Sequence, residues 1–118
     1  MSFGFIDDDV VKGGMDGFVY FSNIGVDCWA VLMDDVHYGQ RDLGMFFDSG
    51  GKMSIIDTGN TSIQIPYSQF QKLKLYMTDQ DPSITTYEYA GNSILRSSKS
   101  CVELESIYSN LQFMLQYT

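Results

Sequence analysis

The feature that most restricts how this chain folds is a long run rich in aromatic and β-branched residues, from Phe18 to Tyr38. Such residues favour extended strands over helices. A turn-like stretch at residues 22–25 interrupts the run, which predicts two strands joined by a turn. Strict alternation along the second strand places Met33 and Val36 on opposite faces. Because both faces carry apolar residues, we expect this strand to be covered on both sides.

The rest of the chain continues the β pattern around one helix. Residues 39–53 contain four glycines and indicate a short strand or the edge of a hairpin. Ile55–Ile56 and Ile63–Ile65 predict two strands that flank a tight loop. Residues 66–77 begin with Pro and place apolar residues at helical spacing, which predicts a helix. Two later segments complete the pattern, residues 79–93 as a polar loop or short strand and residues 111–118 as a strand.

Length and charge limit the kinds of partner that this chain can have. The 118 residues are enough for one domain, and we expect residues 1–118 to form a single mostly-β domain. The net charge of -8 repels phosphate backbones and anionic membrane surfaces. No apolar run approaches the roughly 20 residues needed to cross a bilayer. The sequence therefore predicts no nucleic-acid partner and no membrane span.

Few residues are suited to holding a metal or cofactor. Cys28 and Cys101 lie far apart without Cys-x-x-Cys spacing, and His37 is the only histidine. This argues against a zinc site, and no cofactor is expected. The spacing leaves open whether the two cysteines form a disulfide. The first residues show no signal peptide, so either the protein stays inside the cell or its true N-terminus precedes Met1.

The segment Ser54–Pro66 carries the candidate chemistry. Asp57 follows two β-branched apolar residues and precedes Thr58 and Gly59, at the tip of the loop between two expected strands. Asp and Gly are ordinary turn residues, since Asp accepts hydrogen bonds from nearby N–H groups and Gly allows positive φ. An acid held between rigid flanks is also suited to proton transfer with a bound water. Asp57 is therefore the candidate catalytic residue.

This segment resembles the second catalytic motif of the pepsin-like aspartic proteases, an apolar pair followed by Asp-Thr-Gly and a Pro that opens a helix. Three further stretches are similar to the same family, in the same order. They are residues 3–7, similar to its Phe-Gly-Gly-x-Asp stretch, residues 28–39, similar to its aromatic-Trp strand, and Cys101 with residues 108–115, similar to its Cys and Leu-Pro-x-Ile-x-Phe strand. The resemblance implies a partial C-terminal lobe of a bilobal acid protease fold, mostly β with one or two short helices.

The resemblance also implies an aspartic-type endopeptidase in which Asp57 is one of two catalytic carboxylates. Two carboxylates that share a site do not both ionise readily, so one keeps a proton while the other is charged. The pair activates a water that attacks the peptide carbonyl. By resemblance, the residues that would contact a peptide or protein substrate are Thr58, Gly59, Asn60 and Thr61. Family members are usually secreted or lysosomal/vacuolar, which is the location that the resemblance implies.

The chain departs from the family pattern near the site. Asn60 replaces the usual hydroxyl residue, and Cys28 stands where an aromatic residue is usual. The family's flap hairpin with its Tyr and its closing strand are not recognisable, and the cysteine that pairs with the one matching Cys101 would lie beyond Thr118. We therefore expect a fragment that supplies the second catalytic loop, is inactive alone and needs the missing N-terminal lobe.

Two other interpretations stay open. The chain could form a two-fold dimer in which both acids come from the same position, as in retroviral-type proteases. It could also be a non-catalytic β domain that uses its cleft for binding, which Asn60 favours. The adjacent acids Asp34 and Asp35 face opposite sides of a strand and cannot form a dyad. A partner for Asp57 is therefore expected from the N-terminal lobe or from a second copy of the chain.

Overall fold

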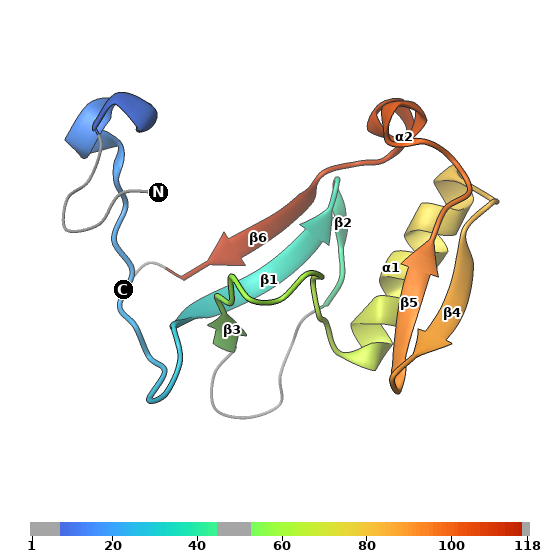
Figure 1. Ribbon diagram of the computed structural model, residues 1–118, viewed down its shortest axis with the longest axis horizontal. Helices are drawn as coiled ribbons and strands as arrows, with labels where there is room; N and C mark the ends of the chain where they lie inside the picture. The colour runs from blue at the N-terminus through green and yellow to red at the C-terminus, as the bar shows by residue number, and fades with distance from the viewer. Residues whose placement is uncertain (1–7, 45–52, 117–118) are drawn as a thin grey trace.

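The computed structural model describes residues 8–44 and 53–116, which form a mostly-β structure (Figure 1). These residues contain two antiparallel sheets, two α-helices and two short 3-10 helices. The strands are β1 (Ala30–Tyr38), β2 (Arg41–Asp42), β3 (Met53–Ile55), β4 (Thr85–Tyr89), β5 (Asn92–Arg96) and β6 (Leu111–Leu115). The helices are η1 (Asp8–Val10), η2 (Gly14–Gly17), α1 (Tyr67–Gln80) and α2 (Cys101–Ile107). The mostly-β prediction is confirmed, and the pepsin-like lobe stays a prediction.

Strand β1 organises the larger sheet because it pairs with three other strands. Figure 1 shows β6 along one edge of β1 and β3 along the other. Strand β2 follows β1 through a turn at Gly39 and pairs with the end of β1. Gly39 has a φ of 61°, and an added Cβ would lie 3.0 Å from Ser109. Both the backbone conformation and the available space therefore require glycine at this turn.

A one-residue irregularity in the β1–β6 pairing decides which side chains of β1 share a face. Met33 pairs with Leu115, whereas Asp35 pairs with Met114, so β1 accommodates one extra residue between them. Such a bulge shifts the alternation of side chains by one position. Met33 and Val36 therefore lie on the same face. The prediction that they lie on opposite faces was wrong because it assumed an unbroken ladder.

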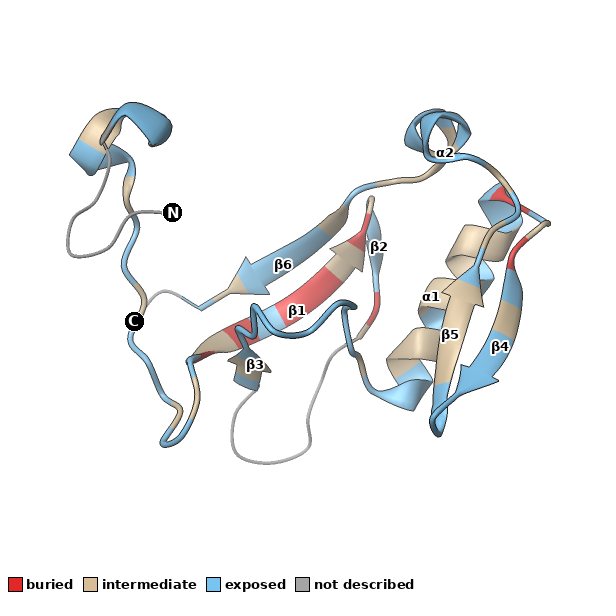
Figure 2. Ribbon diagram, viewed as in Figure 1, coloured by how far each residue is buried: buried red, intermediate tan, exposed pale blue. Residues whose placement is uncertain are grey.

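The face of β1 that carries Met33 and Val36 forms the core, and Figure 2 shows the buried residues concentrated along this strand. The buried apolar residues of this cluster are Met33, Val36, Tyr38 and Leu43. The residues of α1 and β6 that pack against it are Leu73, Tyr76, Met77, Leu111 and Leu115. On the opposite face Asp35 is only 9% exposed. The Met33 face of β1 is therefore covered, as predicted, whereas the opposite face is covered only in part, because Met114, which pairs with Asp35, is exposed.

Two predicted strands are absent from the described residues. Residues 18–29, which include the first expected strand, are irregular, and Val19 and Tyr20 are exposed. Residues 63–65, expected to follow the acidic loop as a strand, are also irregular. Neither the strand expected at residues 18–21 nor the one expected at residues 63–65 pairs with a described strand. Both predictions were wrong because β-branched and aromatic residues stabilise a strand through contacts with a neighbouring strand.

The other strand predictions are confirmed where the structure describes them. Strand β2 lies within residues 39–53, of which 45–52 are outside the described residues. Strands β4 and β6 lie within the predicted segments 79–93 and 111–118. Ala90 and Gly91 both have positive φ between β4 and β5, as a two-residue hairpin turn requires.

The helix predicted at residues 66–77 is confirmed by α1, which follows Pro66 and extends to Gln80. Helix α2 was not predicted, although its signal is present in the sequence. The Ser100 side chain accepts a hydrogen bond from the Glu103 N–H, and the Glu103 carboxylate accepts one from the Ser100 N–H. This capping box satisfies backbone donors at the start of the helix. The hydrogen bonds from Ser100 also lower the pKa of Glu103.

A fully buried carboxylate, Asp81, joins the end of α1 to the hairpin and to α2. It accepts hydrogen bonds from the Ser97 hydroxyl at 2.7 Å, the Tyr108 hydroxyl at 3.0 Å and the Ser83 N–H at 3.0 Å. Burial raises the pKa of Asp81, but the hydrogen bonds more than offset burial, and its pKa falls to about 2. The ionised form of Asp81 therefore connects three segments of the chain.

The core assignment predicts that Leu43→Ala lowers the free energy of unfolding by about 2–5 kcal/mol, because Leu43 is fully buried and its truncation leaves a cavity. Urea denaturation followed by circular dichroism measures the change. The matched control is Leu75→Ala in α1, where the side chain is 60% exposed. Equal losses in the two variants would contradict the assignment of Leu43 to the core.

The Asp81 contacts predict an acid-dependent part of the stability. Because the pKa of Asp81 is lowered from 3.8 to about 2, its contribution is complete above about pH 4 and declines as the pH falls toward about 2. Asp81→Asn is expected to destabilise the protein at neutral pH. It should also make the free energy of unfolding depend less on pH between about pH 4 and 2. Urea unfolding at several pH values measures it, with the exposed Asp27→Asn as control. If the free energy of unfolding of Asp81→Asn depends on pH as that of the wild-type chain does, the prediction is contradicted.

Candidate functional site

Asp57 lies directly after a strand that is fixed to the centre of the larger sheet. Strand β3 pairs with the beginning of β1, with Ile55 opposite Ala30. The pairing continues one residue further, because the Ile56 N–H donates to the Trp29 carbonyl at 2.7 Å. The backbone that leads into Asp57 is therefore held by the sheet, which agrees with the strand predicted before it.

The loop after Asp57 orients its carboxylate. Oδ1 of Asp57 accepts a hydrogen bond from the Gly59 N–H at 2.9 Å, and the Asp57 carbonyl accepts one from the Asn60 N–H at 3.3 Å. This is the turn geometry in which an Asp side chain bonds the backbone two residues further on. A Cβ added at Gly59 would lie 3.2 Å from Oδ1, so a larger residue there would press on the carboxylate.

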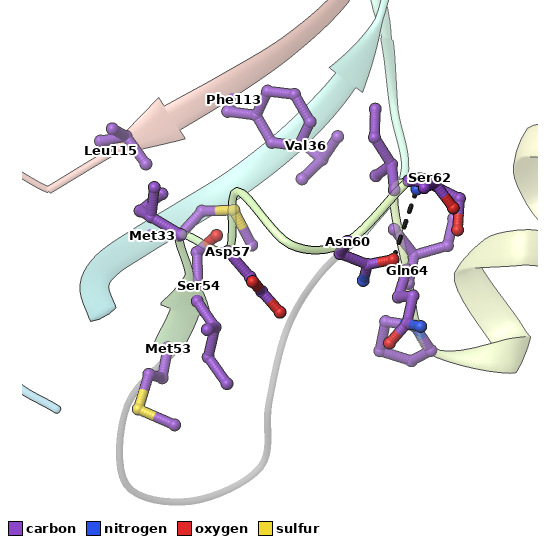
Figure 3. Close-up of a pocket in the computed structure, with 16 residues that line it drawn as sticks. Met33, Val36, Met53, Ser54, Asp57, Asn60, Ser62, Gln64, Phe113 and Leu115 are labelled. Carbon is purple, nitrogen blue, oxygen red and sulfur yellow. Dashed lines mark hydrogen bonds between the residues drawn. The ribbon is translucent and has the colours of Figure 1, made fainter. Parts of the chain in front are cut away.

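The predicted substrate-binding residues are all exposed beside Asp57, but they do not all face the same space. Asn60 and Thr61 line an open groove together with Asp57, whereas Thr58 and Gly59 are not among its lining residues. Oδ1 of Asn60 accepts a hydrogen bond from the Ser62 N–H at 3.3 Å (Figure 3). The side-chain amide oxygen of Asn60 therefore stabilises the loop itself. The side-chain NH₂ group of Asn60 is the part suited to binding a ligand.

The groove has a volume of ≈ 870 Å³ and lies between the larger sheet and the loop that carries Asp57. Figure 3 shows apolar side chains of β1 and β6 on one side and Asp57 and Asn60 on the other. The sheet residues are Met33, Val36, Phe113 and Leu115. Met33 and Val36 both reach the groove only because the β1 bulge places them on one face. Sequence reasoning missed this wall because it kept strict alternation.

Asp57 is the one acid among the groove-lining residues that the structure describes. A single exposed carboxylate held by one backbone N–H can accept or donate one proton. It does not form a pair of carboxylates in which one keeps its proton while the other is ionised. Besides Asp57-Thr58-Gly59, the sequence contains one more tripeptide of the form Asp-Thr/Ser-Gly at residues 48–50, which sequence reasoning missed and which lies outside the described residues. The described residues thus place a single carboxylate, that of Asp57, at the groove.

A second group of titratable side chains lies across the β1–β2 ladder. Single ligand atoms of Asp35, His37 and Asp42 all lie within 4.8 Å of one another. The cross-strand register places His37 opposite Asp42, and His37 Nε2 lies 3.7 Å from Asp35 Oδ2. Oδ1 of Asp35 accepts the Val36 N–H at 2.7 Å. These contacts account for the group as a set of neighbouring side chains on paired strands, and we assign it no metal.

The remaining sequence-level expectations concern the cysteines and the membrane. Cys28 and Cys101 are both free thiols in the structure. Neither α1 nor α2 is long and apolar enough to cross a bilayer. Comparison of the chain with family models, with curated proteins and with solved structures found no match. The resemblance to the pepsin-like proteases is therefore one of sequence motifs alone.

The loop geometry predicts a difference between two substitutions of Asp57. Asp57→Ala removes the oxygen that accepts the Gly59 N–H, whereas Asp57→Asn keeps one. In Asp57→Ala we expect hydrogen exchange of the Gly59 amide to accelerate by about 2- to 10-fold, the equivalent of about 0.5–1.5 kcal/mol. Exchange measured by NMR should stay close to wild type in Asp57→Asn. The Ser62 amide, bonded to Asn60, is the internal control, and an unchanged Gly59 rate in Asp57→Ala would refute the turn.

Proposed function

We propose that this chain is part of an aspartic-type endopeptidase, a partial C-terminal lobe that supplies Asp57 to a two-carboxylate site. The observation that carries the proposal is the position of Asp57. Its carboxylate is exposed, it is oriented by the Gly59 N–H, and it lies at the edge of an apolar groove directly after a strand fixed to β1. Together with the resemblance of Ser54–Pro66 to a catalytic motif, this arrangement favours proteolysis over other hydrolytic chemistry.

The proposed reaction requires a second carboxylate that faces Asp57. In such a pair one acid is ionised and accepts a proton from a shared water, while the other is protonated and hydrogen-bonds the peptide carbonyl oxygen. The water adds to the carbonyl carbon and no covalent enzyme intermediate forms. The second carboxylate would come from an N-terminal lobe or from a second copy of the chain. A lone carboxylate at Asp57 can accept a hydrogen bond from a water but lacks the partner that shares its proton.

The groove suggests how a peptide would lie beside Asp57. Its sheet side is apolar, which suits uncharged side chains of a substrate, and its loop side offers the NH₂ group of Asn60 and the hydroxyl of Thr61. These groups can hydrogen-bond a peptide backbone. Substrate preference would then depend on Met33, Val36 and Phe113, which line the sheet side of the groove.

A second candidate function is binding of a peptide without cleavage. The observation that favours it is that Asp57 is the one acid among the described residues of the groove. Under this alternative, Asp57 and Asn60 act as hydrogen-bonding groups on the rim of an apolar binding surface.

Complementation distinguishes the two candidates. The chain is mixed with a refolded N-terminal lobe of a pepsin-like protease and assayed at acidic pH with an unstructured protein substrate. We expect the chain alone to be inactive and the mixture to cleave in a pepstatin-sensitive manner. Asp57→Asn should lower the cleavage rate by at least about 100-fold, because proton transfer by a positioned acid contributes about 10²–10⁴-fold.

Asp48→Asn is the matched control, since it makes the same chemical change in the other Asp-x-Gly tripeptide. Cleavage that survives Asp57→Asn, or a mixture that is inert, contradicts the proposed protease. Cleavage by the chain alone that is lost with Asp57→Asn contradicts the need for a separate lobe and supports the two-fold dimer instead.

A further inference from the structure

Strand β6 has one paired edge and one open edge. Among the described residues β1 is its only strand neighbour, as Figure 1 shows. The backbone groups of Asn110 and Gln116, on either side of β6, bond to the β1 side of the sheet. Backbone groups of a strand alternate between its two edges. Those of Leu111, Phe113 and Leu115 therefore point away from β1, toward the open edge.

The open edge of β6 lacks the charges that usually protect such edges. No charged side chain occurs from Ser106 to Thr118, although the chain carries a net charge of -8. By contrast β2 contains Arg41, β4 contains Glu88 and β5 contains Arg96. Charged residues on an edge strand prevent pairing with other chains. Two copies of this acidic chain can approach each other at β6 without bringing charged side chains of that strand together.

Side chains on both faces of β6 are also accessible. Phe113 is 43% exposed on the groove face, and Met114 is 45% exposed on the opposite face. A strand added beside β6 would cover part of both side chains. Burial of apolar area and completion of the backbone ladder would then stabilise the same arrangement.

We propose that β6 pairs with β6 of a second copy of the chain, in an antiparallel arrangement about a two-fold axis at Phe113. In this register Phe113 lies opposite the partner's Phe113, and Leu111 lies opposite the partner's Leu115. Leu111, Phe113 and Leu115, whose backbone groups point toward the open edge, then lie opposite one another across the interface. Each of these pairs exchanges two N–H···O=C hydrogen bonds. The edge is self-complementary, which a two-fold interface requires.

The paired edge extends the larger sheet across both copies. Phe113 and Leu115 line the groove, so the two grooves would lie on the same face of one continuous sheet. The pairing uses backbone groups of β6 and does not involve Asp57. It stands whether or not the proposed protease function holds.

Sedimentation velocity and light scattering on the full chain test this interface. The chain is expected to pass from its monomer mass of 13.3 kDa to twice that mass as the concentration rises. Phe113→Pro removes an outward N–H in each copy but no hydrogen bond to β1, and prolines are tolerated on edge strands. It is expected to raise the dimer dissociation constant by at least about tenfold. Phe113→Leu, which keeps the N–H, is the matched control and should remain dimeric.

A second pair of variants keeps the test decisive if Phe113→Pro fails to fold by circular dichroism. Met114→Lys places a charge on the open edge and should weaken the dimer, whereas Met114→Gln should not. A wild-type chain that stays monomeric overturns the proposal. The proposal is also overturned if Met114→Lys, and Phe113→Pro where it folds, dimerise as strongly as the wild-type chain. Assembly beyond the dimer overturns it as well, because it would indicate an interface without closed two-fold symmetry.

Discussion

The larger sheet depends on the way β1 holds one extra residue against β6. Three strands pair with β1, and the irregularity between Met33 and Asp35 decides which of its side chains face the core. Without it, Met33 and Val36 would lie on opposite faces, and neither the apolar cluster nor the sheet side of the groove would be complete. The position of the bulge thus links the packing of the domain to the shape of its candidate site.

The site inherits its geometry from the same strand. β3 ends at Ile55, and one further backbone hydrogen bond holds Ile56 to Trp29. The chain then turns so that the Asp57 carboxylate accepts a hydrogen bond from the Gly59 N–H. The rigid part of the site is therefore backbone, while the Asp57 side chain stays exposed. A loop built in this way can present a carboxylate to a second protein surface without first refolding. That property fits a site completed by another lobe or chain.

Local signals in the sequence were sufficient for the parts of the fold that are stabilised locally. Pro66 with apolar spacing predicted α1, and the acidic turn predicted the end of a strand just before Asp57. The capping box of Ser100 and Glu103 would have found α2. The failures involve long-range pairing. The apolar residues at 18–21 and 63–65 have strand composition but no described strand beside them, and the bulge follows from the register with β6, which the local sequence does not specify.

The pairing of β1 with β6 also has a consequence for the order in which the chain folds. Helix α1 and the β4–β5 hairpin use contacts that are close in sequence, whereas β1 must wait for a strand from the other end of the chain. Loop closure over such a distance slows folding and exposes unpaired strand edges meanwhile. During synthesis, β1 leaves the ribosome well before β6. The edge of β1 that β6 finally occupies therefore stays unpaired for longer than the parts of β1 that pair with β2 and β3.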